Sequence, residues 1–92
     1  MLLEIVTPEA TIFNSEVSSL AVPGINGAFQ MLNNHAPVVS LLDKGLVKIK
    51  GDAVKIAKEF TDKFTKEGDE FQLAINSGTI EMSANKIIIL AD

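Results

Sequence analysis

Short apolar segments separated by turn-forming residues constrain the fold of this chain more than any other feature. The segments are about four to seven residues long, and Pro, Gly, Asn, Asp and Ser interrupt them. They lie at residues 2–7, 10–14, 16–22, 27–32, 38–42, 46–50, 71–76, 79–82 and 86–90. This spacing predicts one mainly β domain over residues 1–92, an antiparallel β-sandwich or flattened barrel of about eight to ten short strands.

Turn chemistry places several of the expected chain reversals. Asn26-Gly27 predicts a tight turn, because both residue types tolerate positive φ. Residues 33–37, Asn-Asn-His-Ala-Pro, predict a loop by composition. Residues 46–50 alternate apolar side chains with lysines, which predicts a strand with one buried face and one face in water.

Residues 52–70 break the strand pattern. Apolar side chains recur there at helical spacing, at Ala53, Ile56, Ala57, Phe60 and Phe64. We expect a helical insertion around residues 53–66, of about three to four turns, with Asp52 capping its start and Gly68 its end. Alternation from Val54 to Phe60 supports a strand as the rival interpretation, and the pattern alone leaves both open.

Composition argues against several classes of function. The chain has no cysteine, which excludes disulfides and thiolate metal sites. It has no arginine, Tyr or Trp and a net charge of −4, which argues against nucleic-acid binding. No apolar run approaches the roughly 20 residues of a membrane span, so we expect no direct insertion into a membrane.

The only histidine, His35, lacks the partners that a reactive or metal-binding centre needs. We expect its ring nitrogens to hold backbone groups in the loop. The segment Gly24–Gly27 has no Lys-Ser/Thr after it and does not fit a phosphate loop. Acids at 67, 69 and 70 fit a solvated turn. We therefore predict no catalytic, cofactor-binding or metal-binding residue, no cofactor and no enzyme activity.

Three stretches form an ordered set of motifs: LLEIVTPEATIFNSEVSSLAVPGINGAFQMLNNHAP at the start, DKGLVKIK in the middle and INSGTIEMSANKIIILAD at the end. This ordered set resembles the epsilon subunit family of the F-type ATP synthases. The resemblance covers nearly the whole chain except about residues 51–70. It implies a non-catalytic central-stalk, or rotor, subunit of a proton-translocating enzyme that synthesises ATP.

The resemblance also implies partners and a location. The partners are the gamma subunit, the membrane c-ring and other ATP synthase subunits, and the location is peripheral, on the cytoplasmic face of the bacterial inner membrane. Family members continue into a two-helix C-terminal domain, and we expect that domain to be absent here. The candidates for a loop that faces the c-ring are Gly24, Ile25, Asn26, Gly27, Ala28, Asn33, Asn34 and His35.

Some positions depart from the family pattern. Leu32-Asn33-Asn34 stands where many members have Leu-Pro-Gly, and Asn34 can keep the turn because asparagine tolerates the left-handed conformation. Ala28 stands where an acid is frequent, which removes a polar contact from the loop expected at the ring.

The alternative function is a free-standing β-sandwich that binds a small molecule or a peptide.

Overall fold

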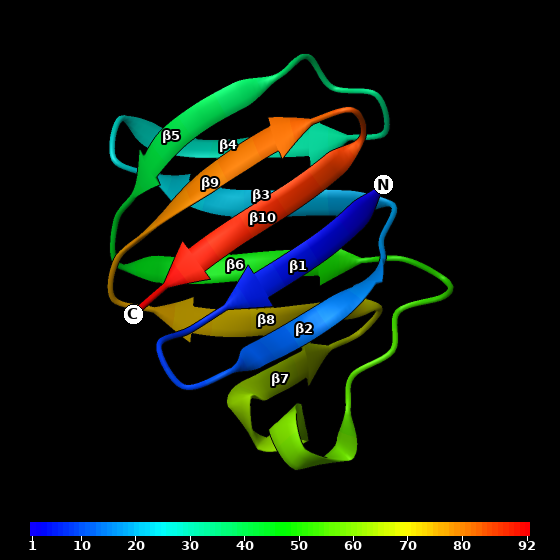
Figure 1. Cartoon of the computed structure of the whole chain (residues 1–92). Coiled ribbons are helices and arrows are strands. Elements are labelled where there is room, and N and C mark those ends of the chain that lie inside the picture. The colour runs from blue at the N-terminus through cyan, green and yellow to red at the C-terminus, as the bar shows by residue number, and fades with distance from the viewer.

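The computed structural model describes all 92 residues, and its regular elements are strands except for one short 3-10 helix (Figure 1). The elements are β1 (Leu2–Val6), β2 (Thr11–Glu16), β3 (Ser19–Gly24), β4 (Gly27–Leu32), β5 (Val38–Leu42), β6 (Gly45–Lys50), the 3-10 helix η1 (Lys58–Lys63), β7 (Phe64–Glu67), β8 (Glu70–Ile75), β9 (Gly78–Ser83) and β10 (Lys86–Ala91). The predicted strands are all present, and β7 is an additional one that the sequence pattern did not separate from the expected helix.

The strands form one sheet that folds back on itself into two layers. The front layer in Figure 1 has the order β2-β1-β10-β9-β5, and the back layer has the order β4-β3-β6-β8-β7. The layers join where β5 meets β3, through the single pair Gly24 and Leu42. The mainly β, sandwich-like fold predicted from the sequence is confirmed.

One strand pair corrects the expectation of a purely antiparallel sheet. β1 and β10 are parallel, with Leu3 opposite Ile87 and Ile5 opposite Ile89, whereas every other pair is antiparallel. Parallel neighbours need a long connection between them. Here the connection contains all the other strands, β2 to β9. No pattern within β1 or β10 could therefore have revealed that these two strands pair.

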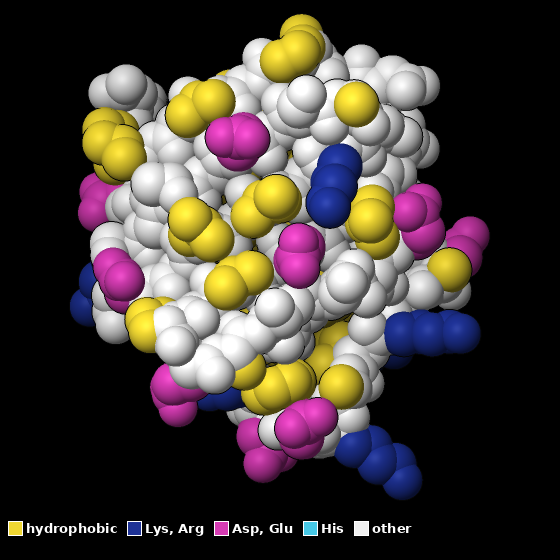
Figure 2. Space-filling view, in the orientation of Figure 1, with side chains coloured by type: hydrophobic (Ala, Val, Ile, Leu, Met, Phe, Trp, Pro, Cys, Tyr) yellow, Lys and Arg dark blue, Asp and Glu magenta, His cyan; other side chains and the backbone are white.

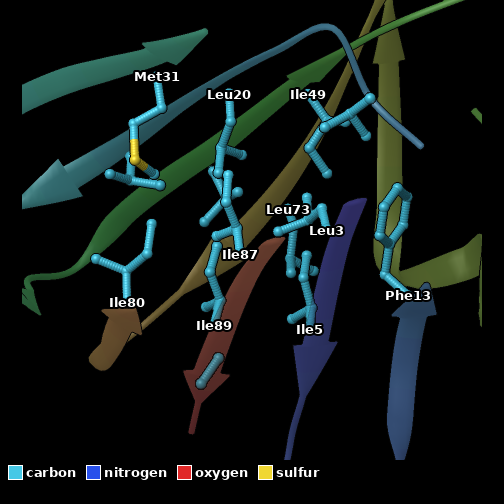
Figure 3. Close-up of a cluster of buried hydrophobic side chains, with 14 of the residues drawn as sticks. Leu3, Ile5, Phe13, Leu20, Met31, Ile49, Leu73, Ile80, Ile87 and Ile89 are labelled. Carbon is cyan, nitrogen blue, oxygen red and sulfur yellow. The ribbon is translucent and has the colours of Figure 1, made fainter. Parts of the chain in front are cut away.

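The core lies between the two layers and consists of 19 buried hydrophobic residues. Figure 3 shows side chains from the front layer, such as Ile5 and Ile87, pointing toward Leu20 and Ile49 of the back layer. All four are fully buried. Each such side chain contributes about 1.5–3 kcal/mol by leaving water, so the alternation of inward residues fixes the register of the strands.

The helix expected around residues 53–66 is wrong over most of its length. Only Lys58–Lys63 is helical, and it is a 3-10 helix that begins after Ala57 with no side-chain cap from Asp52 or any other residue. Residues 64–67 form β7, and Gly68 lies in the turn before β8 with a φ of 62°. Residues 54–57 alternate between half-buried and exposed side chains but belong to no strand, so the rival interpretation of a strand from Val54 to Phe60 is also wrong.

The segment 51–63, which we call the strap, runs from the back layer to the edge of the front layer. Val54, Ile56 and Phe60 pack against the core. Ser15 on β2 accepts a hydrogen bond from the Lys55 backbone N–H at 3.0 Å and donates to the Ala53 carbonyl oxygen at 3.3 Å. An extended chain advances about twice as far per residue as an α-helix, so this stretch reaches both layers where a helix would not.

Candidate functional site

The outer surface of the front layer carries large aliphatic side chains that the core does not use. Val39 and Leu41 on β5 are 76% and 56% exposed, and Leu90 on β10 is 53% exposed. Half-buried Val6 on β1 and Ile88 on β10 also point outward, because they alternate with the buried residues of the same strands. We call Val6, Val39, Leu41, Ile88 and Leu90 the apolar face.

Strand register sets these side chains in two parallel rows across the front layer. Leu90 lies between Val6 on β1 and Thr79 on β9, and Thr79 lies opposite Leu41. In the neighbouring row Ile88 lies between Glu4 and Glu81, and Glu81 lies opposite Val39. Figure 2 looks onto this side of the molecule and shows hydrophobic side chains spread among acidic ones. The rows thus combine aliphatic side chains with polar ones, as interaction surfaces with an apolar centre and a polar rim also do.

A shallow groove of about 660 Å³ lies at one end of the apolar face. Its apolar lining includes Val6, Leu41, Leu90 and Ile25. Ile25, in the turn between β3 and β4, is 51% exposed, and its backbone N–H donates to the Leu41 carbonyl oxygen at 3.2 Å. This hydrogen bond fixes the turn against β5 and extends the apolar surface beyond the strands.

The first group of predicted ring-facing residues, Gly24 to Ala28, forms that turn. Gly24 pairs with Gly27 across the hairpin, and Ile25 and Asn26 are its exposed tip. Gly27 has a φ of 118°, as the Asn-Gly signal predicted for this position. A side chain at position 24 would lie 2.7 Å from the Phe29 ring, so the hairpin closes tightly here.

The second group, Asn33 to His35, lies in the loop after β4. Asn34 has a φ of 62°, which confirms the left-handed turn predicted for it, and its backbone N–H donates to the Asn85 side chain at 2.9 Å. His35 is exposed, and its Nδ1 lies 2.7 Å from the Ala36 carbonyl oxygen. This contact agrees with the role expected for the histidine, which is to hold loop backbone.

The turn and the loop lie at opposite ends of β4. A strand of that length spans about 17 Å, so the predicted ring-facing residues form two groups and not one cluster. The long edge of β4 connects them, because β4 pairs only with β3. Contact of either group with a c-ring stays a prediction.

The structure gathers no group of three or more His, Cys, Asp or Glu side chains that could hold a metal ion. The acids at 67, 69 and 70 surround the exposed turn between β7 and β8, with Glu67 opposite Glu70. The absence of catalytic, cofactor and metal residues stays a prediction. The structure also contains no helix with the length and hydropathy that crossing a membrane requires.

Sequence reasoning missed the exposed members of the apolar face. Val39, Leu41 and Leu90 sit in runs that are apolar at nearly every position, VVSLL and KIIIL. Such runs carry no alternation that would separate inward from outward residues. The only available signal was the excess of apolar residues over what one buried face of a strand can use.

Comparisons with known proteins agree with this fold. The family model described as "ATP synthase, Delta/Epsilon chain, beta-sandwich domain" matches residues 1–92. The ATP synthase epsilon chain of Campylobacter concisus is 41% identical over 90 residues, which are 98% of this chain and 59% of that protein. The epsilon chain of Chlorobaculum tepidum is 37% identical over 90 residues, 98% of this chain and 86% of that protein.

A solved structure has the same fold at low sequence identity. It is a chain of the central stalk and c-ring of the mitochondrial ATP synthase from Tetrahymena thermophila, with a TM-score of 0.67, 18% identity, and coverage of 99% of this chain and 62% of that one. This chain spans 59% of the length of the Campylobacter relative and 86% of the length of the Chlorobaculum relative. Because the family model matches from the first residue to the last, the chain belongs to the ATP synthase delta/epsilon family and has the fold of its β-sandwich domain.

Proposed function

We propose that this protein is a non-catalytic central-stalk subunit that links the gamma subunit to the c-ring of a proton-translocating F-type ATP synthase. Family membership and relatives named ATP synthase epsilon chain support this role. The stalk and c-ring structure with the same fold adds support for the architecture. The subunit works by holding two partners at a fixed angle during proton-driven ATP synthesis, and it binds peripherally at the cytoplasmic face of the bacterial inner membrane.

The apolar face is the proposed contact with gamma. The observation that carries this assignment is the exposure of Val39, Leu41 and Leu90 on one side of one layer. Several exposed aliphatic side chains on one face favour an interaction surface, since leaving them in water has a free-energy cost that a partner removes. The packed core behind them resists deformation, as a coupling that transmits torque requires.

The edge of β4 is the proposed contact with the c-ring. If β4 lies along the ring, the turn at Gly24–Ala28 and the loop at Asn33–His35 both touch it. The apolar face lies close to this edge along the sheet, because β5, which carries Val39 and Leu41, pairs with β3, the strand that carries β4. One side of the sandwich is free for a central shaft while its edge rests on the ring.

Copurification with gamma tests the first contact. The tagged chain, expressed with gamma and the catalytic subunits, should retain them. Leu41→Glu should weaken the affinity for gamma by about 100-fold, because it buries a charge in the contact. The matched control Leu46→Glu, on the back layer, should stay within about threefold of the unmodified chain. A chain that stays monomeric with gamma present would favour the alternative, a free-standing ligand- or peptide-binding module that uses the open groove.

Cysteine cross-linking tests the second contact. Asn26→Cys, in the turn, and Asn34→Cys, in the loop, should both form disulfides with cysteines placed in the c-subunit loops. A cross-link from only one of them would show that the sandwich contacts the ring at one end only and would overturn the proposed orientation.

ATP hydrolysis by the isolated chain tests the non-catalytic role. We expect none, and measurable turnover would contradict that role.

A further inference from the structure

The second row of the apolar face places two carboxylates around one aliphatic side chain. Glu4 on β1 and Glu81 on β9 flank Ile88 on β10 in register. The two acids are two strands apart, about 10 Å, and project from the same side of the layer. Glu4 is half-buried and Glu81 is exposed.

Neither carboxylate has an ion-pair partner within the chain. The single ion pair joins the Met1 ammonium to Glu16 at 3.6 Å. Lys86 lies one row further along β10, opposite Leu2 and Ser83, and makes no ion pair with either acid. Figure 2 shows acidic and basic side chains exposed among the hydrophobic ones on this side of the molecule.

A partner that covers the apolar face must also cover these acids. Removing a carboxylate from water costs several kcal/mol unless a cation or hydrogen-bond donors replace the water. We infer that the covering segment of gamma places a lysine or arginine over Ile88, between Glu4 and Glu81, and apolar side chains over Leu41 and Leu90. This inference rests on the proposed function and assigns the chemistry of the partner at that same surface.

Charge-neutralising substitutions test the inference, with purified gamma as the probe. Glu81→Gln and Glu4→Gln should each weaken the affinity for gamma by about tenfold, because each leaves the cation with one acid. Lys86→Gln should strengthen it by a few-fold, since it removes a like charge near the cation. Glu67→Gln, in the β7–β8 turn, is the matched control and should leave the affinity unchanged. Circular dichroism should show the same fold in all four variants, whose substituted side chains do not belong to the buried core.

Salt dependence provides a second readout. The affinity of the unmodified chain for gamma should fall as salt rises from low to physiological concentration, and the Glu4→Gln, Glu81→Gln double variant should lose most of that dependence. Equal affinities and equal salt dependence in the double variant would overturn the inference and leave the stalk role intact. Failure of the unmodified chain to bind gamma would overturn both.

Discussion

The two outer faces of the sandwich share one construction and differ in chemistry. Each lies on a layer whose inner side chains are buried in the common core. On the front layer the outward positions of β5 and β10 hold Val39, Leu41 and Leu90. On the back layer the outward positions of β6 hold Leu46, Lys48 and Lys50.

The difference separates what folding requires from what binding requires. The back layer shows that a strand of this protein can pack with a largely polar outer side, since Lys48 and Lys50 of β6 face water beside one outward leucine, Leu46. The additional aliphatic residues on the front layer therefore do not serve the core. Leu32 and Leu46 on the back layer are also exposed, at 55% and 41%, but the front layer has three such side chains on β5 and β10, and this is the physical reason to assign that layer to a partner.

The largest expected effect tests whether inward and outward residues of one front strand differ in their contribution to the free energy of unfolding. Ile89, fully buried, and Leu90, 53% exposed, are neighbours on β10. Ile89→Ala should lower the free energy of unfolding by about 3–4 kcal/mol, through lost burial and a cavity. Leu90→Ala should lower it by less than about 1 kcal/mol. Urea denaturation measures both, and similar losses would refute the division of the strand into two faces.

A smaller effect tests the strap that joins the edges of the two layers. Ser15→Ala removes the hydrogen bonds to Lys55 and Ala53 and should cost about 1–2 kcal/mol. The Lys55 amide should then exchange with solvent faster, as amide hydrogen exchange would show. Ser83→Ala, on an exposed position of β9, is the control and should change the unfolding free energy by less than about 0.5 kcal/mol. Unchanged exchange at Lys55 would mean that the strap does not depend on Ser15.

The smallest expected effect compares how much the front and back layers contribute to the affinity for gamma. Val39→Ala should weaken the affinity for gamma by about fivefold, because it shortens the most exposed side chain of the apolar face. Leu46→Ala on the back layer should leave that affinity unchanged. Calorimetric titration with gamma measures both. A larger loss from Leu46→Ala would reassign the docking surface to the back layer.

The predictable parts of the fold were those set by local chemistry. Val47 and Ile49 are buried between exposed lysines, as their alternation predicted. Gly27 and Asn34 adopt positive φ, as their residue types predicted. The strap was the local failure. Its apolar side chains fit both a helix and an extended chain, and contacts with β2 and the core, which lie far away in the sequence, decided between them.

The two loops proposed to face the ring were predictable as loops, but their role in a site stays a prediction and their relative placement was not predictable. The turn at Gly24–Ala28 and the loop at Asn33–His35 both exist, yet the sequence could not show that β4 holds them apart. The apolar face was out of reach for a related reason. In a strand that is apolar on both sides, only the neighbouring strands decide which side is buried.

The sequence by itself determined the approximate positions of nine of the ten strands, most of the turns and which family its motifs resemble, because these depend on residues close together along the chain. The tertiary structure alone decided that β1 runs parallel to β10, that the strap closes the edge, and that Val39, Leu41 and Leu90 remain in water. Those outcomes depend on contacts between distant residues. Pairing and burial are properties of neighbours in space, and an apolar side chain does not specify which neighbour will cover it.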